Sequence, residues 1–538
     1  MDPNTTKNAK SIEPYQVYEK FKLRKFKKCS VTGDIPSELK REFLVELAAP
    51  AADIFNSITM SGEYPRQWVK EYTTPVPKTK PVESEDDLRP ISLTSDLSKD
   101  YENFLIEWLE PYVSTKLDPG QMGGRKGCSI VHYLITLFHF ILSGTDTTDK
   151  APKAVIIALI DYSKGFNRIS HNKLIIRLSD WGVPGWLLRI LCSYLKDRSM
   201  TLRHKGTESS PHPLPGGSAQ GCVLGILSFI VDISDSGMDV PSQPPPNPDE
   251  VDVHSLPQPQ PAVTASEVRQ KFIDDQVQGE LLKLDTDLHK MPENFIGPRT
   301  YHDRHGLVNK EETLLQKRLN DIELHTSIHQ MKINTKKTKI MPFNFTKKFD
   351  FNPKFTIDGR VLDVVHSTKL LGIVIQSDCK WGGNTKNIVS KAKKRIWFLR
   401  RLKLLGASRG TLIDTFKLFI RSLLEMGVPI WAAALTKKQS QDIEAVQINC
   451  LKVICGLNFI TYQQSLAMLN LETLAARRDK LCLKFAKKCA KDPKFSGWFP
   501  KKVAIGTRSK NKYLEPRART KRFQTSSIPH LTRLLNSA

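Results

Sequence analysis

A continuous apolar segment that ends in a carboxylate most constrains the fold of this chain. Residues 155–160, VIIALI, are followed directly by Asp161. An uninterrupted β-branched run without polar alternation is typical of a strand that is buried on both faces of a sheet. A charged group beside such a strand is costly unless it is compensated, and a bound metal ion is a common compensation. The segment therefore predicts a mixed α/β core with a carboxylate where one strand leaves the sheet.

Two further acids, Asp274 and Asp275, lie at the centre of a second β-type segment. Residues 268–278 contain two short β-type runs on either side of this doublet, so both acids are expected at the tip of a hairpin. A single Asp at a strand end is most often a turn residue. Three carboxylates on neighbouring strands, however, can hold two Mg²⁺ ions about 3.5 to 4 Å apart, the arrangement that drives in-line phosphoryl displacement.

A glycine-rich loop lies between these acids in the sequence. Residues 216–221, GGSAQG, are rich in turn formers, and residues 222–233 carry apolar side chains at helical spacing. The sequence therefore predicts a loop followed at once by a helix.

The charge of the chain indicates the class of its partner. The chain has 81 Lys and Arg against 56 Asp and Glu, a net charge of +25. Basic residues are concentrated in residues 20–28, in residues 386–409 and in residues 491–538. One such stretch is ordinarily a solvated helix face, but three in one chain favour a phosphate backbone as the partner.

Targeting signals and metal-binding cysteines are not recognisable in the sequence. No apolar run reaches the roughly 20 residues that a membrane-spanning helix needs, and the first 20 residues contain no signal-peptide core. The nine cysteines show no zinc-binding spacing. We therefore expect an intracellular protein with reduced thiols, nuclear and cytoplasmic, without a membrane partner.

Changes in composition divide the chain into segments. Residues 1–30 are expected to form a basic, polar leader, and residues 31–384 a mixed α/β unit. Within that unit, residues 240–262 contain eight prolines and are expected to form an extended insertion. Residues 385–490 are expected to be all helical, and residues 491–538 to form a disordered, basic nucleic-acid arm. The predicted helices cover about residues 385–405, 409–424, 440–455 and 462–488.

Seven short blocks follow one another in a fixed order between residues 88 and 381. They are LRPISLTSDLSKDYE (88–102), QMGGRKGCS (121–129), ALIDYSKGFNRI (158–169), GGSAQGCVLG (216–225), FIDD (272–275), INTKKTKIMPF (333–343) and TKLLGIVIQSDCKW (368–381). In this order they resemble the reverse transcriptase of non-LTR (LINE-type) retrotransposons. The resemblance extends over about residues 30–490, with its core at 60–375. It implies an α+β right-hand polymerase, with fingers and an antiparallel-sheet palm followed by an all-helical thumb.

The resemblance also implies roles for individual residues. Asp161, Asp274 and Asp275 would be the catalytic ligands of two Mg²⁺ ions, and Lys337 would be the general acid for the pyrophosphate leaving group. The implied nucleotide-binding residues are Arg89, Phe166, Gln220 and Gly221. The implied primer and template contacts are Leu371, Gly372, Lys393, Lys394, Arg395, Arg400 and Arg401.

The implied activity is RNA-directed DNA polymerisation, with an RNA template, a DNA primer and dNTPs as partners. Two alternatives stay open: an inactive relic that binds nucleic acid, and an RNA-templated RNA polymerase, which FIDD in place of Gly-Asp-Asp disfavours. No endonuclease module is recognisable in the sequence, so we expect the chain to be part of a longer element with an upstream endonuclease. Several positions depart from the family pattern, but none of them is an implied metal ligand: Gly124, Gly165, Asn167, Ala219 and Cys222.

Overall fold

The protein consists of two compact units whose sequences are interleaved. The computed structural model describes residues 9–24, 34–78, 81–146, 153–219, 221–234, 267–272, 275–283, 313–345, 354–502 and 512–538. The first unit comprises Met1–Lys126, Asp161–Pro261 and Arg318–Asn334, and the second comprises Gly127–Ile160, Ala262–Lys317 and Thr335–Ala538. The predicted proline-rich insertion at residues 240–262 lies outside the described residues.

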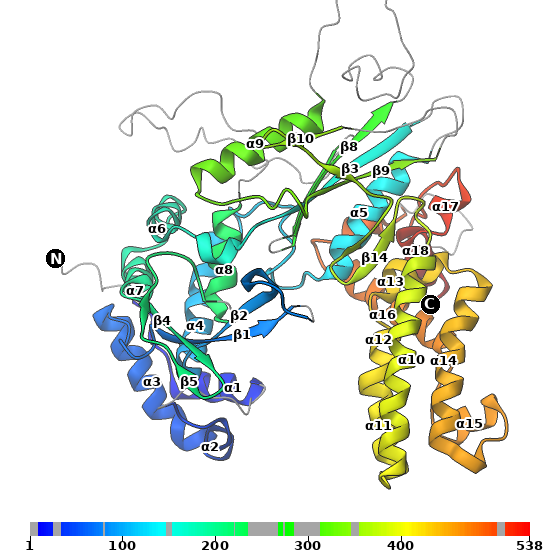
Figure 1. Ribbon diagram of the computed structural model, residues 1–538, viewed down its shortest axis with the longest axis horizontal. Coiled ribbons are helices and arrows are strands. Elements are labelled where there is room, and N and C mark those ends of the chain that lie inside the picture. The colour runs from blue at the N-terminus through cyan, green and yellow to red at the C-terminus, as the bar shows by residue number, and fades with distance from the viewer. Residues whose placement is uncertain are drawn as a thin grey trace, which may run out of the picture. The chain divides into compact units, whose positions relative to one another are not determined.

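The first unit contains a small mixed sheet, shown in Figure 1. Its strands follow the order β2-β1-β4-β5, and β6 pairs with β4. The β1 and β2 strands are antiparallel, with Tyr72 opposite Leu93, whereas β1 and β4 are parallel, with Lys70 opposite Ser199. The strands are β1 (Lys70–Pro77), β2 (Leu88–Leu93), β4 (Ser199–His204), β5 (Thr207–Glu208) and β6 (His212–Pro213).

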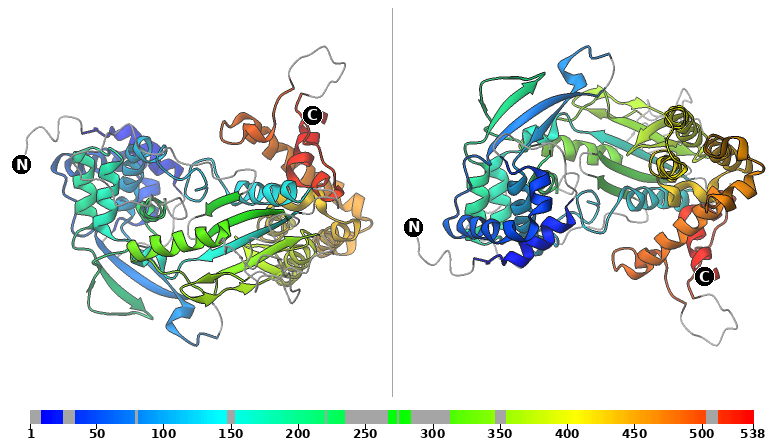
Figure 2. Two further views of the ribbon diagram at one scale, coloured as in Figure 1. Left: turned by 90° about the horizontal axis from the view of Figure 1, so that it is seen from above. Right: turned by 90° about the horizontal axis from the view of Figure 1, so that it is seen from below.

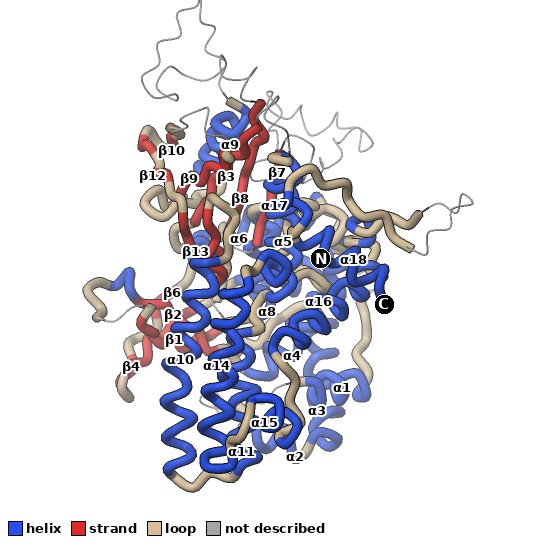
Figure 3. Tube along the Cα trace, turned by 90° about the vertical axis from the view of Figure 1, so that its right-hand side faces the viewer, coloured by secondary structure: helices blue, strands red, loops and turns tan. Residues whose placement is uncertain are grey.

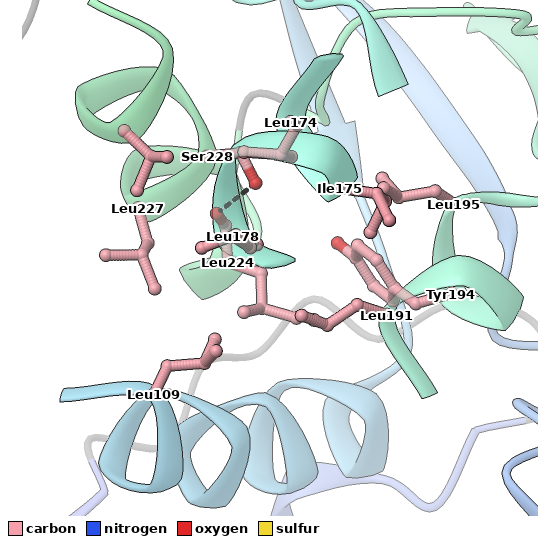
Figure 4. Close-up of a pocket in the computed structure, with 11 residues that line it drawn as sticks. Leu109, Leu174, Ile175, Leu178, Leu191, Tyr194, Leu195, Leu224, Leu227 and Ser228 are labelled. Atoms are coloured by element: carbon pink, nitrogen blue, oxygen red, sulfur yellow. Dashed lines mark hydrogen bonds between the residues drawn. The ribbon is translucent and has the colours of Figure 1, made fainter. Parts of the chain in front are cut away.

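Helices form the apolar core of this unit. Leucine, isoleucine and valine side chains from α4, α6, α7 and α8 meet around a cavity of about 10 Å³ (Figure 4). That volume holds about one water molecule, so the helices are closely packed and this cavity is no ligand site. The helices are α3 (Leu44–Ser61), α4 (Asp96–Val113), α6 (His171–Asp180), α7 (Gly185–Leu195) and α8 (Val223–Asp232).

The predicted polar leader is wrong for residues 14–23, which form helix α1 (Pro14–Leu23). Val17 and Phe21 are fully buried, and α1 packs on α3. Of the basic residues predicted to face phosphate, Lys20 forms an ion pair with Glu107 (2.6 Å), and Arg24 forms one with Asp96 (2.9 Å). The burial of Val17 and Phe21, four residues apart on one face of α1, therefore explains this segment better than solvation of its charges does.

The second unit contains a five-stranded sheet in the order β12-β9-β3-β8-β7. The predicted buried strand is confirmed, since the six residues 155–160 of β3 are all buried. The sheet is antiparallel at β9–β3 and at β7–β8, but β12 is parallel to β9. The predicted antiparallel sheet is wrong at this edge, where β12 runs in the same direction as β9. The strands are β3 (Lys153–Asp161), β7 (Glu267–Phe272), β8 (Asp275–Lys283), β9 (Lys339–Asn344) and β12 (Asp363–Val364).

Helix α5 (Ile130–Gly144) contacts the edge strand β7 of this sheet and is buried along most of its length (Figure 2). On its other side it contacts helices from the end of the chain, namely α13 (Val428–Trp431), α17 (Lys521–Gln524) and α18 (Ser527–Ser537). The helix is therefore enclosed between a sheet and a helical layer, which explains its almost uninterrupted apolar sequence.

The helical region begins at α10 and follows the predicted order. The first three predicted helices are confirmed, and α10 and α14 lie side by side (Figure 3). The fourth predicted helix is wrong as a single helix, because Asn470, at φ 49°, divides it. The Thr473 hydroxyl caps the helix that follows by accepting a hydrogen bond from the Ala476 amide (3.2 Å). The helices are α10 (Gly382–Leu404), α11 (Arg409–Thr415), α12 (Ser422–Leu424), α13 (Val428–Trp431), α14 (Lys437–Cys455), α15 (Tyr462–Met468) and α16 (Leu474–Lys491), with a π-helical turn, Phe416–Arg421, between α11 and α12.

The predicted disorder of residues 491–538 is wrong for their final part. Helices α17 (Lys521–Gln524) and α18 (Ser527–Ser537) follow an extended stretch, and α18 packs on α16. Phe523, Ile528 and Leu531 are buried in this contact region. The Asp146 carboxylate at the end of α5 accepts hydrogen bonds from the Thr520 amide (2.7 Å) and hydroxyl (2.6 Å). The segment folds because its few apolar side chains pack against helices α5 and α16.

Within the described ranges, no single helix combines the length and the apolar character needed to cross a membrane, although the bent pair Lys437–Asn458 and Tyr462–Met468 meets that requirement jointly.

Two histidines on α5, His132 buried and His139 half-buried, predict a pH-dependent stability of the second unit. Burial lowers the pKa of His132 to about 4, helped by nearby Lys488, and burial also lowers the pKa of His139 to about 4. Both pKa values lie below the ordinary value of about 6.5, so the unfolded chain binds protons that the folded chain does not. We expect full stability above about pH 6.5 and a progressive loss as the pH falls towards 4.

Urea unfolding of the wild type and of a variant with His132→Gln and His139→Gln, measured from pH 7.5 to pH 4, tests this expectation. The variant controls for carboxylates, which also titrate in acid, and its stability should fall less steeply between pH 6.5 and 4. Parallel curves for the two proteins would contradict the prediction.

Candidate active site

Asp161 is the last residue of β3, and its backbone is fixed where the strand enters the first unit. Its carbonyl accepts a hydrogen bond from the Asn334 amide (2.7 Å), and the Ser163 amide donates to the Lys332 carbonyl (2.7 Å). Tyr162 forms an isolated β-bridge with Ile333. The side chain of Asp161 is half-buried. A partly exposed carboxylate on a rigid backbone is well suited to bind a cation.

The glycine-rich loop is bonded directly to the segment that follows β3 through two of its described residues, Gly217 and Ser218. The Ser218 amide donates to the Phe166 carbonyl (2.7 Å), and the Gly217 amide donates to the Ile169 carbonyl (2.8 Å). Two sequence blocks that lie far apart along the chain, residues 158–169 and 216–225, are therefore joined by backbone hydrogen bonds within the first unit.

Two glycines of this loop have no room for a side chain. Gly217 has φ 81°, and a Cβ atom there would lie 2.9 Å from backbone atoms of Asn167. Gly221 has φ 141°, and a Cβ atom there would lie 2.7 Å from the Ser92 carbonyl oxygen. Both conformations are unfavourable for residues with a side chain, and backbone atoms cannot move aside as a flexible side chain can. The loop thus requires glycine for its close approach to neighbouring backbone.

We expect Gly217→Ala to destabilise the first unit by about 1 to 3 kcal/mol more than Gly182→Ala does. Gly182 is a matched control because its φ is 83° and no heavy atom lies within 4 Å of a Cβ atom there. The difference between the two variants therefore isolates the clash with Asn167 from the strain of a positive φ. Denaturant unfolding of both variants measures this difference, and equal costs would contradict the clash.

Phe166 lies in the short 3₁₀ helix Gly165–Arg168, immediately after Asp161 and its turn. Its ring is half-buried and stacks on Phe229 of α8, with 4.8 Å between ring centroids and an angle of 21° between ring planes. The ring is therefore held in one orientation while part of it stays accessible. The neighbouring Gly165 departs from the family pattern, and a Cβ atom there would lie 2.7 Å from the Phe229 ring.

Cys222 occupies the position that precedes helix α8. Its Sγ accepts a hydrogen bond from the Gly225 amide (3.2 Å), and its thiol donates to the Ala219 carbonyl (3.2 Å). Burial raises the pKa of this thiol to about 11, so it stays protonated and able to donate near neutral pH. The cysteine that departs from the family pattern therefore still caps the helix, as a serine at this position could.

Asp275 and Lys337 belong to the second unit. Asp275 is the first residue of β8, pairs with Phe272 across the hairpin and has a half-buried side chain. Lys337 is exposed in a turn that precedes β9. The other two predicted site residues of these motifs, Asp274 and Gln220, lie outside the described residues.

Arg89 and the pair Leu371–Gly372 lie on β-hairpins. Arg89 is exposed on β2, opposite Val76. Leu371 (φ 48°) and Gly372 (φ 88°) form the two-residue connection between β13 (Ser367–Leu370) and β14 (Ile373–Gln376). Two consecutive positive φ values are the geometry of a tight hairpin turn, and Leu371 is there at an energetic cost.

Helix α10 presents a basic surface. Lys393, Lys394, Arg400 and Arg401 are exposed, and Arg395 is half-buried with its guanidinium 4.3 Å from the centre of the Phe419 ring. In the part of the chain that the structure describes, none of the basic side chains of α10 forms an ion pair with a carboxylate. These charges are thus available to an outside partner.

The four consecutive apolar residues 396–399 of α10 do not share one buried face. Ile396 and Leu399 are buried, but Trp397 is 64% exposed and Phe398 is 43% exposed. The helical period explains this, because residues three or four apart share a face while adjacent residues diverge by about 100°. Beside this helix, a groove of about 1020 Å³ runs between α10 and α14. Its lining includes Lys386, Lys393, Lys394 and Lys438 together with Asp378 and Asp442.

Sequence reasoning missed three residues that hold the glycine-rich loop. The ring Nε2–H of His171 donates to the Gly217 carbonyl (2.7 Å), the Ser92 carbonyl contacts Gly221, and Glu102 binds the start of α8. Ser92 and Glu102 lie in the block LRPISLTSDLSKDYE (88–102). The sequence identified this block as one of the seven, but it did not indicate which residues Ser92 and Glu102 contact. A loop in which three of six residues are glycine has few side chains with which to anchor itself, so it needs such outside anchors, and that requirement is the signal.

The carboxylates, histidines and cysteines are the potential metal ligands of the chain. Among the residues with a described placement, no cluster of three or more His, Cys, Asp or Glu side chains forms a metal-binding group. The set that the sequence predicts includes Asp274, which is not among those residues. Its two described members, Asp161 and Asp275, belong to β3 and β8, which are neighbouring strands of the sheet.

Comparison with known proteins agrees with the motifs. Residues 76–243 match the family described as "Reverse transcriptase (RNA-dependent DNA polymerase)". The predicted relationship to the reverse transcriptases of non-LTR retrotransposons is confirmed by this match and by transposon polymerases of Drosophila melanogaster.

Two of these relatives match most of the chain. The chain is 25% identical over 481 residues to "Probable RNA-directed DNA polymerase from transposon BS", with 86% of this chain and 47% of the relative covered. It is 21% identical over 417 residues to "RNA-directed DNA polymerase from mobile element jockey", with 75% and 39% covered. The chain thus spans less than half the length of each of these relatives.

Proposed function

We propose that this protein is an RNA-directed DNA polymerase that extends a DNA primer on an RNA template and releases pyrophosphate from dNTPs. The observation that carries this proposal is the reverse transcriptase match at residues 76–243, which contains Asp161 and the loop bonded to the segment after it. We further propose a right-hand arrangement, in which the β1–β2 sheet belongs to the fingers, the β3 sheet to the palm and α10–α16 to the thumb. Such substrates would place the reaction in the nucleus or cytoplasm.

Asp161, Asp274 and Asp275 are proposed to hold two Mg²⁺ ions. Carboxylate oxygens are the ligands that Mg²⁺ prefers, and β3 and β8, which carry Asp161 and Asp275, are neighbours in one sheet. Two bound ions would activate the primer 3′-hydroxyl and stabilise the charge that develops on the leaving group. The role of the protein is to hold the carboxylates on rigid strand ends.

Three other side chains are proposed to act on the nucleotide. Lys337, exposed in its turn, would donate a proton to the pyrophosphate leaving group. Arg89, exposed on β2, would bind the triphosphate through its guanidinium. Phe166, fixed by its stacking on Phe229, would contact the sugar and exclude a 2′-hydroxyl. Gln220 and Gly221 would complete the nucleotide site from the loop.

The primer and template are proposed to be bound by backbone contacts without sequence readout. Leu371 and Gly372 would present their tight turn to the primer end. The basic side chains of α10 would neutralise phosphates, an interaction that weakens with rising salt. Lys393, Lys394, Arg395, Arg400 and Arg401 are the residues proposed for this contact.

Primer extension on poly(rA)/oligo(dT) with dTTP and Mg²⁺ tests the proposed function. The wild type should extend the primer, and a variant with Asp274→Ala and Asp275→Ala should not. Equal signals from the two proteins would refute the polymerase. Template binding without extension would instead identify a nucleic-acid-binding relic, and incorporation of UTP in preference to dTTP would identify an RNA polymerase.

A further inference from the structure

The N-terminus of helix α8 is capped by a side chain from a distant helix. The amides of Val223 and Leu224 both donate to Oε2 of Glu102, at 2.6 and 3.1 Å. The next amide, that of Gly225, donates to Cys222. The first amides of a helix have no partner within the helix, so Glu102, on α4, supplies what the local sequence lacks.

Glu102 is completely buried, and a buried carboxylate is energetically costly unless hydrogen bonds compensate its charge. Its Oε1 accepts from the Ser98 hydroxyl (3.1 Å), and Ser98 also contacts the Tyr64 hydroxyl (3.0 Å). Burial raises the pKa of Glu102, and the amides of α8 and the nearby Arg198 oppose this rise. A carboxylate in such a place is stabilised by its hydrogen bonds and by the positive end of the helix dipole.

The helix that Glu102 holds begins where the glycine-rich loop ends. At that end, Gly221 lies against the Ser92 carbonyl, and at the other end the loop is bonded to the segment containing Phe166. A displacement of α8 along its axis would therefore move the loop relative to Ser92 and relative to the segment that contains Phe166. A free helix N-terminus beside a glycine-rich loop is also an attractive site for phosphate, and the Glu102 carboxylate already occupies it.

We propose that Glu102 is a positioning residue for the incoming dNTP: it fixes the described residues of the glycine-rich loop, 216–219, 221 and 222, and excludes the triphosphate from the N-terminus of α8. This inference rests on the proposed polymerase function. Glu102 would act on the nucleotide through the loop, without contacting the nucleotide itself.

The test compares Glu102→Gln with Glu107→Gln in steady-state primer extension. Glutamine keeps the size of the side chain and one acceptor oxygen but removes the charge that matches the helix dipole. We expect the KM for dTTP to rise about 10- to 100-fold, with the KM for template–primer unchanged. Glu107 lies on the same helix but is exposed and paired with Lys20, so its variant should behave as the wild type.

A merely structural role gives a different result. Loss of folded protein lowers the apparent kcat in proportion to the inactive fraction and leaves the KM for dTTP unchanged. An unchanged KM in Glu102→Gln, whether or not kcat falls, would overturn the proposal.

Amide hydrogen exchange supplies a second measurement that does not depend on catalysis. In Glu102→Gln, exchange should accelerate in peptides that cover residues 216–226 and stay unchanged in peptides from α1 and α3. Ser98→Ala removes the Oε1 partner and the contact with the Tyr64 hydroxyl but leaves the α8 amides bonded to Oε2, so it should give a smaller acceleration. Absence of extension by the wild type would refute the polymerase proposal, whereas unchanged exchange in Glu102→Gln would refute the positioning of the loop by Glu102.

Discussion

Asp161→Asn is expected to reduce primer extension by at least about 100-fold while leaving template–primer affinity within about twofold of the wild type. Asparagine has the same shape but no negative charge, so it binds a divalent cation far more weakly than aspartate does. The backbone carbonyl of residue 161 accepts its hydrogen bond from the Asn334 amide whichever of the two side chains is present, so we expect the end of the strand to keep its position. Single-turnover extension with saturating template–primer measures the loss.

Asp180→Asn is the matched control for this variant. Asp180 is the last residue of α6, belongs to the same unit and is exposed, so the same change of charge there should leave extension unaltered. Circular dichroism and filter binding on both variants verify that they are folded and bind template–primer. Extension by Asp161→Asn at the level of Asp180→Asn would exclude the proposed role of Asp161.

Leu531→Ala should destabilise the second unit by about 2 to 5 kcal/mol. Leu531 is fully buried on α18, which packs on α16, so truncation removes apolar contacts and leaves a cavity. The effect would be surprising for a disordered basic tail, in which such a substitution costs nothing. Urea unfolding followed by circular dichroism, with linear extrapolation, gives the change in free energy.

Leu514→Ala provides the comparison within the same segment. Leu514 is 45% exposed, and its truncation should change the free energy of unfolding by no more than about 0.5 kcal/mol. If both leucines behave alike, α18 does not contribute to the core of the second unit in solution.

The strands and helices with strong local patterns were predictable from the sequence. The run that forms β3 has no polar interruption, and the stripes of α8, α11 and α14 repeat at helical spacing, so local periodicity alone identified them. The order of the catalytic blocks was likewise recognisable. What such patterns report is which residues are apolar and how they are spaced along the chain.

The remaining features depend on contacts between distant residues. Phe523, Ile528 and Leu531 are sparse among basic neighbours, and only the surface they meet makes them core residues. The hydrogen bonds from α8 to Glu102 join residues 121 and 122 positions apart, and the side chain could equally well have been solvated. Sequence spacing contains no information on such pairings, which are decided by the assembled fold.

The closure of α5 by the end of the chain has a consequence for synthesis of the protein. Asp146 and Thr520, which join these two regions, are 374 residues apart. At about 5 to 20 residues per second, a ribosome needs roughly 20 to 75 s to travel that distance. During this interval the apolar surface of α5 is exposed, because the helices that later cover it have not yet been synthesised. We therefore expect chaperones that bind exposed hydrophobic segments to bind the nascent chain.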